Sequence, residues 1–131
     1  MRMFLLCIVI AGCSRASRPV SVPLASPSGE FSVTTEISGE EAGPTRRFCV
    51  RLKLKDAQTS RETRFQTGAS DAQKWALAWS PSGAIVLYSS DIGTRAYDIK
   101  DGQIIERSPD KAEKDVARRA YKAKYSRQPP A

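Results

Sequence analysis

The chain has 131 residues, with 21 lysines and arginines against 14 aspartates and glutamates, which gives a net charge of +7. It contains no histidine. It therefore lacks the side chain that most often acts as a general base, completes catalytic triads and binds zinc. We expect a non-enzymatic protein with no metal and no cofactor.

The chain opens with an apolar run from Met3 to Ile10, preceded by Arg2 and followed by the small residues Ala11 and Gly12. A basic residue, an apolar region and small residues in this order are typical of an export signal. The run is much shorter than the ~20 apolar residues that a membrane-spanning helix needs. A cleavable signal is therefore favoured over its alternatives, a permanent span or a buried N-terminal strand.

The end of this run, Ile10-Ala11-Gly12-Cys13, resembles the lipobox of bacterial lipoproteins. The resemblance implies that residues 1–12 are a signal peptide that is removed, and that Cys13 becomes the acylated first residue. Its acyl chains, palmitate among them, would anchor the protein stably in a membrane, on the periplasmic side. In that family Asp after the cysteine is typical of inner-membrane retention. Ser14 stands there instead, which favours the outer membrane if the organism has one.

Export would change how charge and thiols are interpreted. Loss of Arg2 lowers the net charge from +7 to +6. In the envelope this charge predicts contact with lipid phosphates or wall polymers rather than with nucleic acid. Because Cys7 is removed and Cys13 is lipidated, Cys49 remains as a free thiol and a candidate for an intermolecular disulfide.

Residues 13–29 are rich in proline and serine, which is typical of an extended linker. We expect a lipidated tether that leads to a β domain over residues 30–107. An edge strand over Val20–Leu24, with Pro23 at its margin, is the alternative.

Two segments alternate apolar and polar side chains and predict half-buried strands, at residues 30–37 and 47–55. A hairpin that pairs Phe31 with Leu52 would set Glu36 opposite Arg47. Cys49 lies on the polar face of the second segment. So do the basic side chains Arg47, Arg51, Lys53 and Lys55, the basic ladder. Either neighbouring acidic residues neutralise this ladder, or it contacts anionic lipid or glycan phosphates.

The next part of the chain alternates short strand patterns with turns. Strands are predicted at residues 61–67, 75–79, 84–88, 94–99 and 103–106. Ser-Pro-Ser-Gly at 80–83 and Asp101-Gly102 supply turns between them. The sequence therefore predicts a mainly β fold, an antiparallel meander of about six to seven strands with one C-terminal amphipathic helix.

Ser-Pro-Ser-Gly occurs twice, at residues 26–29 and 80–83, each time before a predicted strand. The second unit resembles a single blade of the WD40-like or TolB-like β-propellers, in which an aromatic strand, a Ser-Pro-x-Gly turn and hairpins recur. The resemblance implies blade-like local topology. A propeller needs at least four blades, whereas this chain holds two at most, so the functions of propellers are not expected here.

Residues 108–126 predict a helix that starts at Ser108-Pro109-Asp110, with Ser108 as its cap. Its apolar stripe consists of Ala112, Val116, Ala117, Ala120, Tyr121 and Tyr125. This helix either covers the sheet or touches a membrane surface with its basic side. Residues 127–131 are expected to be a disordered tail.

These features predict a small non-enzymatic lipoprotein of the cell envelope that binds a protein or a wall component. The alternative is a basic module that docks on anionic lipid or glycan phosphates. Asp91, Asp98 and Asp101 could be imagined as a carboxylate cluster, but Asp91 and Asp101 are better explained as turn formers.

Overall fold

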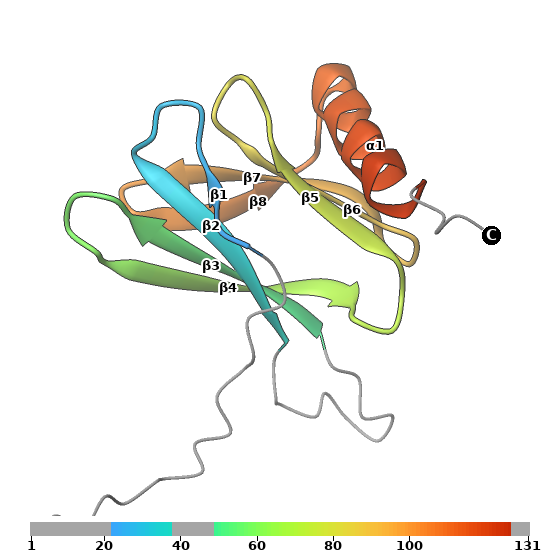
Figure 1. Ribbon diagram of the computed structural model, residues 1–131, viewed down its shortest axis with the longest axis horizontal. Helices are drawn as coiled ribbons and strands as arrows, with labels where there is room; N and C mark the ends of the chain where they lie inside the picture. Colours follow the sequence, from blue (N-terminus) through green and yellow to red (C-terminus); the bar gives the residue numbers. More distant parts are fainter. Residues whose placement is uncertain (1–21, 38–48, 127–131) are drawn as a thin grey trace, which may run out of the picture.

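The computed structural model of the protein describes residues 22–37 and 49–126. In chain order its elements are β1 (Leu24–Ala25), β2 (Phe31–Ile37), β3 (Cys49–Asp56), β4 (Glu62–Ser70), β5 (Trp75–Trp79), β6 (Ile85–Ser89), β7 (Gly93–Lys100), β8 (Gln103–Arg107) and α1 (Lys111–Tyr125). Strands β1–β4 form a first antiparallel sheet and β5–β8 a second, each in chain order. Helix α1 covers the second sheet (Figure 1). The expected mainly β fold with one C-terminal helix is confirmed.

The register of the first hairpin differs from the predicted one. Phe31 lies opposite Asp56 rather than Leu52, and Glu36 lies opposite Arg51 rather than Arg47. The pairing has slid by four residues along β3. Because side chains alternate with period two, an even shift keeps every apolar residue on the core side. The apolar pattern thus predicted which side of each strand faces the core, but it did not determine the register.

The first sheet begins earlier than the predicted domain boundary at Glu30. Leu24 pairs with Val33 of β2, so the last part of the proline-rich segment is an edge strand. The indole nitrogen of Trp79 donates a hydrogen bond of 2.9 Å to the carbonyl oxygen of Leu24. This bond ties the edge of the first sheet to β5 of the second. This edge strand shares only Leu24 with the predicted alternative, Val20–Leu24, whose first two residues lie outside the described residues.

Both Ser-Pro-Ser-Gly segments form turns of similar construction, although Ser26 bonds to Phe31 and Ser80 to Ala84, so that the first turn is one residue longer. Gly29 and Gly83 have φ values of +76° and +90°, which glycine adopts without steric cost. Each glycine amide donates to the carbonyl of the first serine, at 2.9 and 3.0 Å. The hydroxyl oxygens of Ser26 and Ser80 each accept a bond of 3.1 Å from a backbone amide after the turn. The two sheets are therefore built on one plan, with this turn joining the first and second strands of each.

The two sheets pack face to face. Val33 of β2 and Leu87 of β6 are both fully buried in one shared core. The described sheets thus form a two-layer sandwich and not a propeller.

The centre of the sandwich is occupied by Tyr97 of β7, which is 0% exposed. Its ring meets Phe65 of β4 edge to face, with 5.4 Å between the ring centroids. Among the described residues its hydroxyl has no hydrogen-bond partner, and burial raises its pKa well above 10. The ring therefore joins the sheets, while the unpaired hydroxyl costs about 1–3 kcal/mol.

Helix α1 packs on the other face of the second sheet. Ala117 is fully buried against Val86 and Ala96, and the rings of Tyr88 and Tyr121 meet with centroids 4.7 Å apart. Small side chains let the helix backbone come close to the sheet. The interpretation in which the apolar stripe covers the sheet is confirmed, although Ala112 is exposed and does not belong to it.

The helix starts with a cap that differs from the predicted one. The N-cap residue is Asp110 rather than Ser108, and its side chain accepts from the Glu113 amide at 2.8 Å. The Glu113 carboxylate in turn accepts from the Asp110 amide at 3.0 Å, which completes a capping box. Asp110 satisfies the helix amide that Ser108, two residues earlier, was expected to satisfy.

Glu113 also holds the helix on the sheet. The Arg107 guanidinium at the end of β8 makes two hydrogen bonds of 2.7 Å to its carboxylate and one of 2.6 Å to Asp98. These bonds lower the pKa of Glu113 below its ordinary value of 4.5, although burial acts in the opposite direction. The carboxylates of Glu113 and Asp98 raise the pKa of Arg107, and Glu113 has the larger effect. The bidentate pair therefore fixes the angle at which the chain leaves the sheet.

The other end of α1 closes the free edge of β5. The Tyr125 hydroxyl accepts from the Trp75 amide at 3.0 Å and donates to the Trp75 carbonyl at 2.9 Å. Lys124 donates to the same carbonyl at 2.8 Å and lies 3.6 Å from the centroid of the Trp75 ring. These contacts satisfy backbone groups that an edge strand would otherwise leave for another chain.

Replacing Glu113 by glutamine should lower the free energy of unfolding by about 2 kcal/mol at neutral pH, because a buried charged pair is lost. Because the pKa of Glu113 is lower in the folded protein than its ordinary value, its carboxylate stabilises the fold above pH 4.5. This contribution is lost as the pH falls through the pKa of the folded state. Urea denaturation between pH 7 and pH 3 should therefore show the difference between wild type and Glu113→Gln shrinking with acidity. The matched control is Glu106→Gln, which removes only an exposed pair with Arg95 and should cost under about 1 kcal/mol. A difference that stays constant with pH would contradict this account.

Candidate functional site

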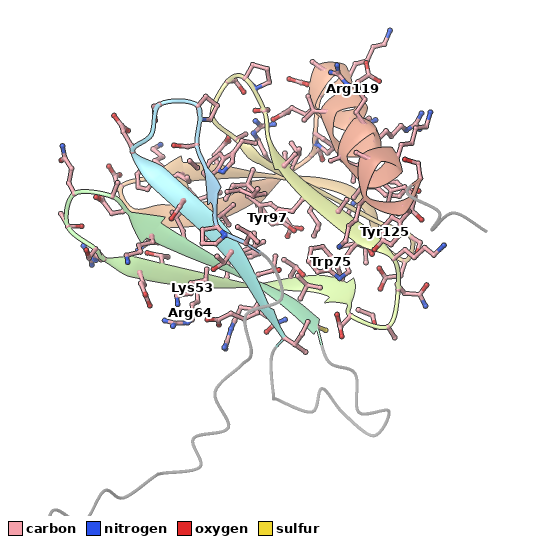
Figure 2. The ribbon with its side chains drawn as sticks, viewed as in Figure 1. Lys53, Arg64, Trp75, Tyr97, Arg119 and Tyr125 are labelled. Carbon is pink, nitrogen blue, oxygen red and sulfur yellow. The ribbon has the colours of Figure 1, made fainter. Side chains whose placement is uncertain are left out.

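The basic ladder lies on the outer face of the first sheet, on the side away from α1. Arg51 and Lys53 project from β3, with Arg64 of β4 beside them. Figure 2 shows Lys53 and Arg64 on the opposite side of the molecule from α1. Lys55 is exposed at the end of β3. The fourth predicted member, Arg47, lies outside the described residues.

The charges of the ladder are paired within the sheet. Glu36 of β2 is only 6% exposed. Its carboxylate meets Arg51 at 2.9 Å, Arg64 at 3.4 Å and Lys53 at 3.8 Å. Glu62 of β4 adds contacts of 3.4 Å to Lys53 and 3.2 Å to Arg64. Neighbouring strands thus pair Arg51 and Lys53, two of the three described members of the ladder, although the partners are not those that the predicted register implied.

The remaining predicted groups are separated in the fold. Cys49 is a free, partly exposed thiol at the start of β3, and Cys13 lies outside the described residues. Asp98 binds Arg107, and Asp101 occupies a turn with φ of +52°. No three histidine, cysteine or acidic residues within 22–37 and 49–126 come together as a metal site.

Asp91 links the two sheets rather than serving a ligand. Its carboxylate accepts from the Ser70 amide at 3.0 Å and from the Ser89 hydroxyl. Burial acts to raise the pKa of Asp91, but these hydrogen bonds outweigh it and hold the pKa below 3.8. Asp91 therefore fixes the turn between β6 and β7, in agreement with its predicted role as a turn former.

Helix α1 carries a second basic surface, on the side that faces away from the sheet. It consists of Lys111, Lys114, Arg118, Arg119 and Lys122, here called the cationic face of α1. All five side chains are exposed, and no acidic side chain in the described parts of the chain pairs with them. Asp115 is the acidic residue among them, and it lines a shallow depression with Arg118, Arg119 and Lys122.

The sequence patterns do not show which basic residues have acidic neighbours in the fold. Alternation shows that basic residues point outward, but not that Glu36 and Glu62 lie between them. On the helix the signal was present in the spacing 111, 114, 118 and 122, which repeats every three to four residues along one side.

The comparisons with known proteins add no family or relative. A scan against protein-family models finds no match, and searches of curated proteins and of solved structures also find none. Among the described residues no helix is both long and apolar enough to cross a membrane.

Glu36→Gln should lower the free energy of unfolding by about 2 kcal/mol, because Arg51, Lys53 and Arg64 would then repel one another around an almost buried amide. Added salt should recover part of this loss by screening the repulsion. Thermal denaturation at low and high ionic strength measures both effects. Lys55→Gln is the control and should stay within about 0.5 kcal/mol. Equal stability of Glu36→Gln and wild type would show that the network is not a structural element.

Proposed function

We propose that this protein is a lipoprotein of the cell envelope, anchored through Cys13 on the periplasmic side of a membrane, whose folded domain is a non-enzymatic binding module. The sequence Ile10-Ala11-Gly12-Cys13 supports the anchor, and Ser14 favours the outer membrane where one exists. The lack of histidine in the whole sequence supports a binding role rather than catalysis.

The observation that carries the binding role is the unpaired cationic face of α1. Each exposed lysine or arginine near an anionic membrane contributes roughly 1 kcal/mol of attraction. The five cations face solvent with Asp115 as their acidic neighbour, whereas the ladder of β3 already has Glu36 and Glu62. We therefore assign contact with lipid or glycan phosphates to the helix, and not to the sheet.

The composition of the helix limits how it binds. Its larger apolar side chains, Val116, Tyr121 and Tyr125, pack against the second sheet or its edge. The outer side therefore has no large apolar group to insert between acyl chains. Binding through this face is peripheral and depends on salt.

The anchor would strengthen such weak contacts. From Cys13 to Val22 the chain could span at most roughly 30 Å in a fully extended form. A domain held within this distance of a phosphate-bearing surface has a high effective concentration there. A face of modest affinity is then sufficient to keep the domain docked.

The anchor is tested by expressing the wild type beside Cys13→Ala and measuring mass and membrane fractionation. We expect the wild type as an acylated species that starts at Cys13 and sediments with membranes. We expect the variant to keep residues 1–12 and to lack lipid. A wild-type protein that retains residues 1–12 without lipid would contradict the proposed anchor.

Docking is tested with unlipidated protein and vesicles that contain anionic phospholipid. The triple variant Lys114→Glu, Arg118→Glu, Lys122→Glu should lose affinity by roughly a hundredfold or more, since three attractive charges are reversed. The matched control, Lys55→Glu, Arg61→Glu, Lys100→Glu, changes the net charge equally at exposed positions outside α1. It should lose less than about tenfold. Equal losses in both variants would show that overall charge, and not the cationic face of α1, drives binding.

A further inference from the structure

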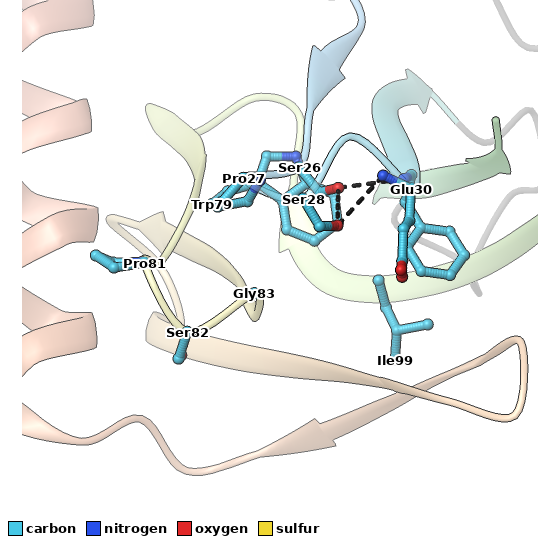
Figure 3. Close-up of a pocket in the computed structure, with 10 residues that line it drawn as sticks. Ser26, Pro27, Ser28, Glu30, Trp79, Pro81, Ser82, Gly83 and Ile99 are labelled. Atoms are coloured by element: carbon cyan, nitrogen blue, oxygen red, sulfur yellow. Dashed lines mark hydrogen bonds between the residues drawn. The ribbon is translucent and has the colours of Figure 1, made fainter.

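A groove opens at the end of the sandwich where the two Ser-Pro-Ser-Gly turns come together (Figure 3). Its volume is ≈ 290 Å³. Phe31 of β2, Trp79 of β5 and Ile99 of β7 line it, and all three are core residues that remain partly exposed. The mouth of the shared core thus presents two aromatic rings to solvent between two similar turns.

Each turn leaves one hydroxyl proton available to a ligand. Ser80 is 2% exposed, and its hydroxyl lies 2.8 Å from that of Ser82. Because the Ser80 oxygen already accepts from Ala84, its own proton is best placed on Ser82. The Ser82 hydroxyl, which lines the groove, is then free to donate outward.

The first turn repeats this arrangement. Ser26 is 7% exposed and lies 3.3 Å from the hydroxyl of Ser28. The Ser26 oxygen accepts from the Phe31 amide at 3.1 Å and the Ser28 oxygen accepts from the Glu30 amide at 3.2 Å, so either hydroxyl can donate to the other. The two turns therefore place a serine hydroxyl from each sheet at the groove.

The groove also holds an acceptor. Glu30 is exposed beside Phe31, and within the described part of the chain no group pairs with its carboxylate. No lysine or arginine lines the groove. An anionic ligand would be repelled there, although the protein as a whole is strongly basic. The chemistry of the groove is thus different from that of the cationic face of α1.

We propose that this groove binds a neutral pyranose ring of a polysaccharide. A pyranose has an apolar C–H face that can lie on the partly exposed ring of Trp79, and hydroxyls that can donate to Glu30 and accept from Ser28 and Ser82. A purely apolar ligand would leave these polar groups without partners, and an organic cation would leave the two O–H donors unused. Binding clefts for small molecules begin at roughly 300 Å³, so the groove suits one ring at a time.

The two tryptophans allow the site to be observed directly. In the complete ¹⁵N-labelled chain, the Trp79 indole N–H lies at the groove and bonds to Leu24. Trp75 is 5% exposed and lies under Lys124. On addition of cellotriose or chitotriose in the millimolar range, we expect the Trp79 indole resonance to shift and that of Trp75 to stay. No shift of Trp79 with either trisaccharide would overturn the proposal, and so would a shift of Trp79 with tetramethylammonium or inorganic phosphate alone.

The variants are placed at exposed positions, and the Trp75 resonance reports whether the fold is kept. Glu30→Ala together with Ser82→Ala should weaken trisaccharide binding about tenfold or more, while the Trp75 resonance keeps its position and reports an intact fold. Glu106→Ala, an exposed acidic position on β8, is the control and should bind as the wild type does. Unchanged affinity of the Glu30→Ala, Ser82→Ala variant would refute the assigned contacts.

Discussion

The packing of the two sheets on one apolar core is the constraint on which the rest of the molecule depends. Each buried valine, leucine or isoleucine contributes roughly 1.5–3 kcal/mol when it is removed from water. Val33, Leu52, Ile85 and Leu87 all make this contribution in the same layer, around the ring of Tyr97. Once the two inner faces have met, each sheet has one outer face left, and each must be made compatible with water.

The two outer faces are made compatible with water in different ways. The second sheet has small and apolar residues outside, such as Ala96 and Val86, and α1 covers them. The first sheet has charged residues outside, and Glu36 compensates the cations around it. As a result Arg51 and Lys53 of the sheet have acidic partners, whereas the cations of the helix have none among the described residues. The cationic face of α1 is thus a consequence of how the sandwich is completed.

The sequence predicted most of the fold because its signals are local. Period-two alternation identified β2 and β3, and Asp101-Gly102 identified the β7–β8 hairpin. Contacts between residues far apart in the sequence could not be predicted from these local signals. The slide that brings Arg51 opposite Glu36 depends on the loop between the strands. The groove depends on two turns 54 positions apart in the sequence, and repetition of Ser-Pro-Ser-Gly indicated a repeated unit without showing that the copies meet.

The most direct test of the central claim is to map which face of the domain meets an anionic surface. Vesicles that contain anionic phospholipid and a spin-labelled headgroup would be added to unlipidated ¹⁵N-labelled protein, and the loss of amide signal measured along the chain. The account predicts the largest losses in α1, at Lys114, Arg118 and Lys122, and little loss in β3. Losses centred on Arg51 and Lys53, with α1 unaffected, would contradict it.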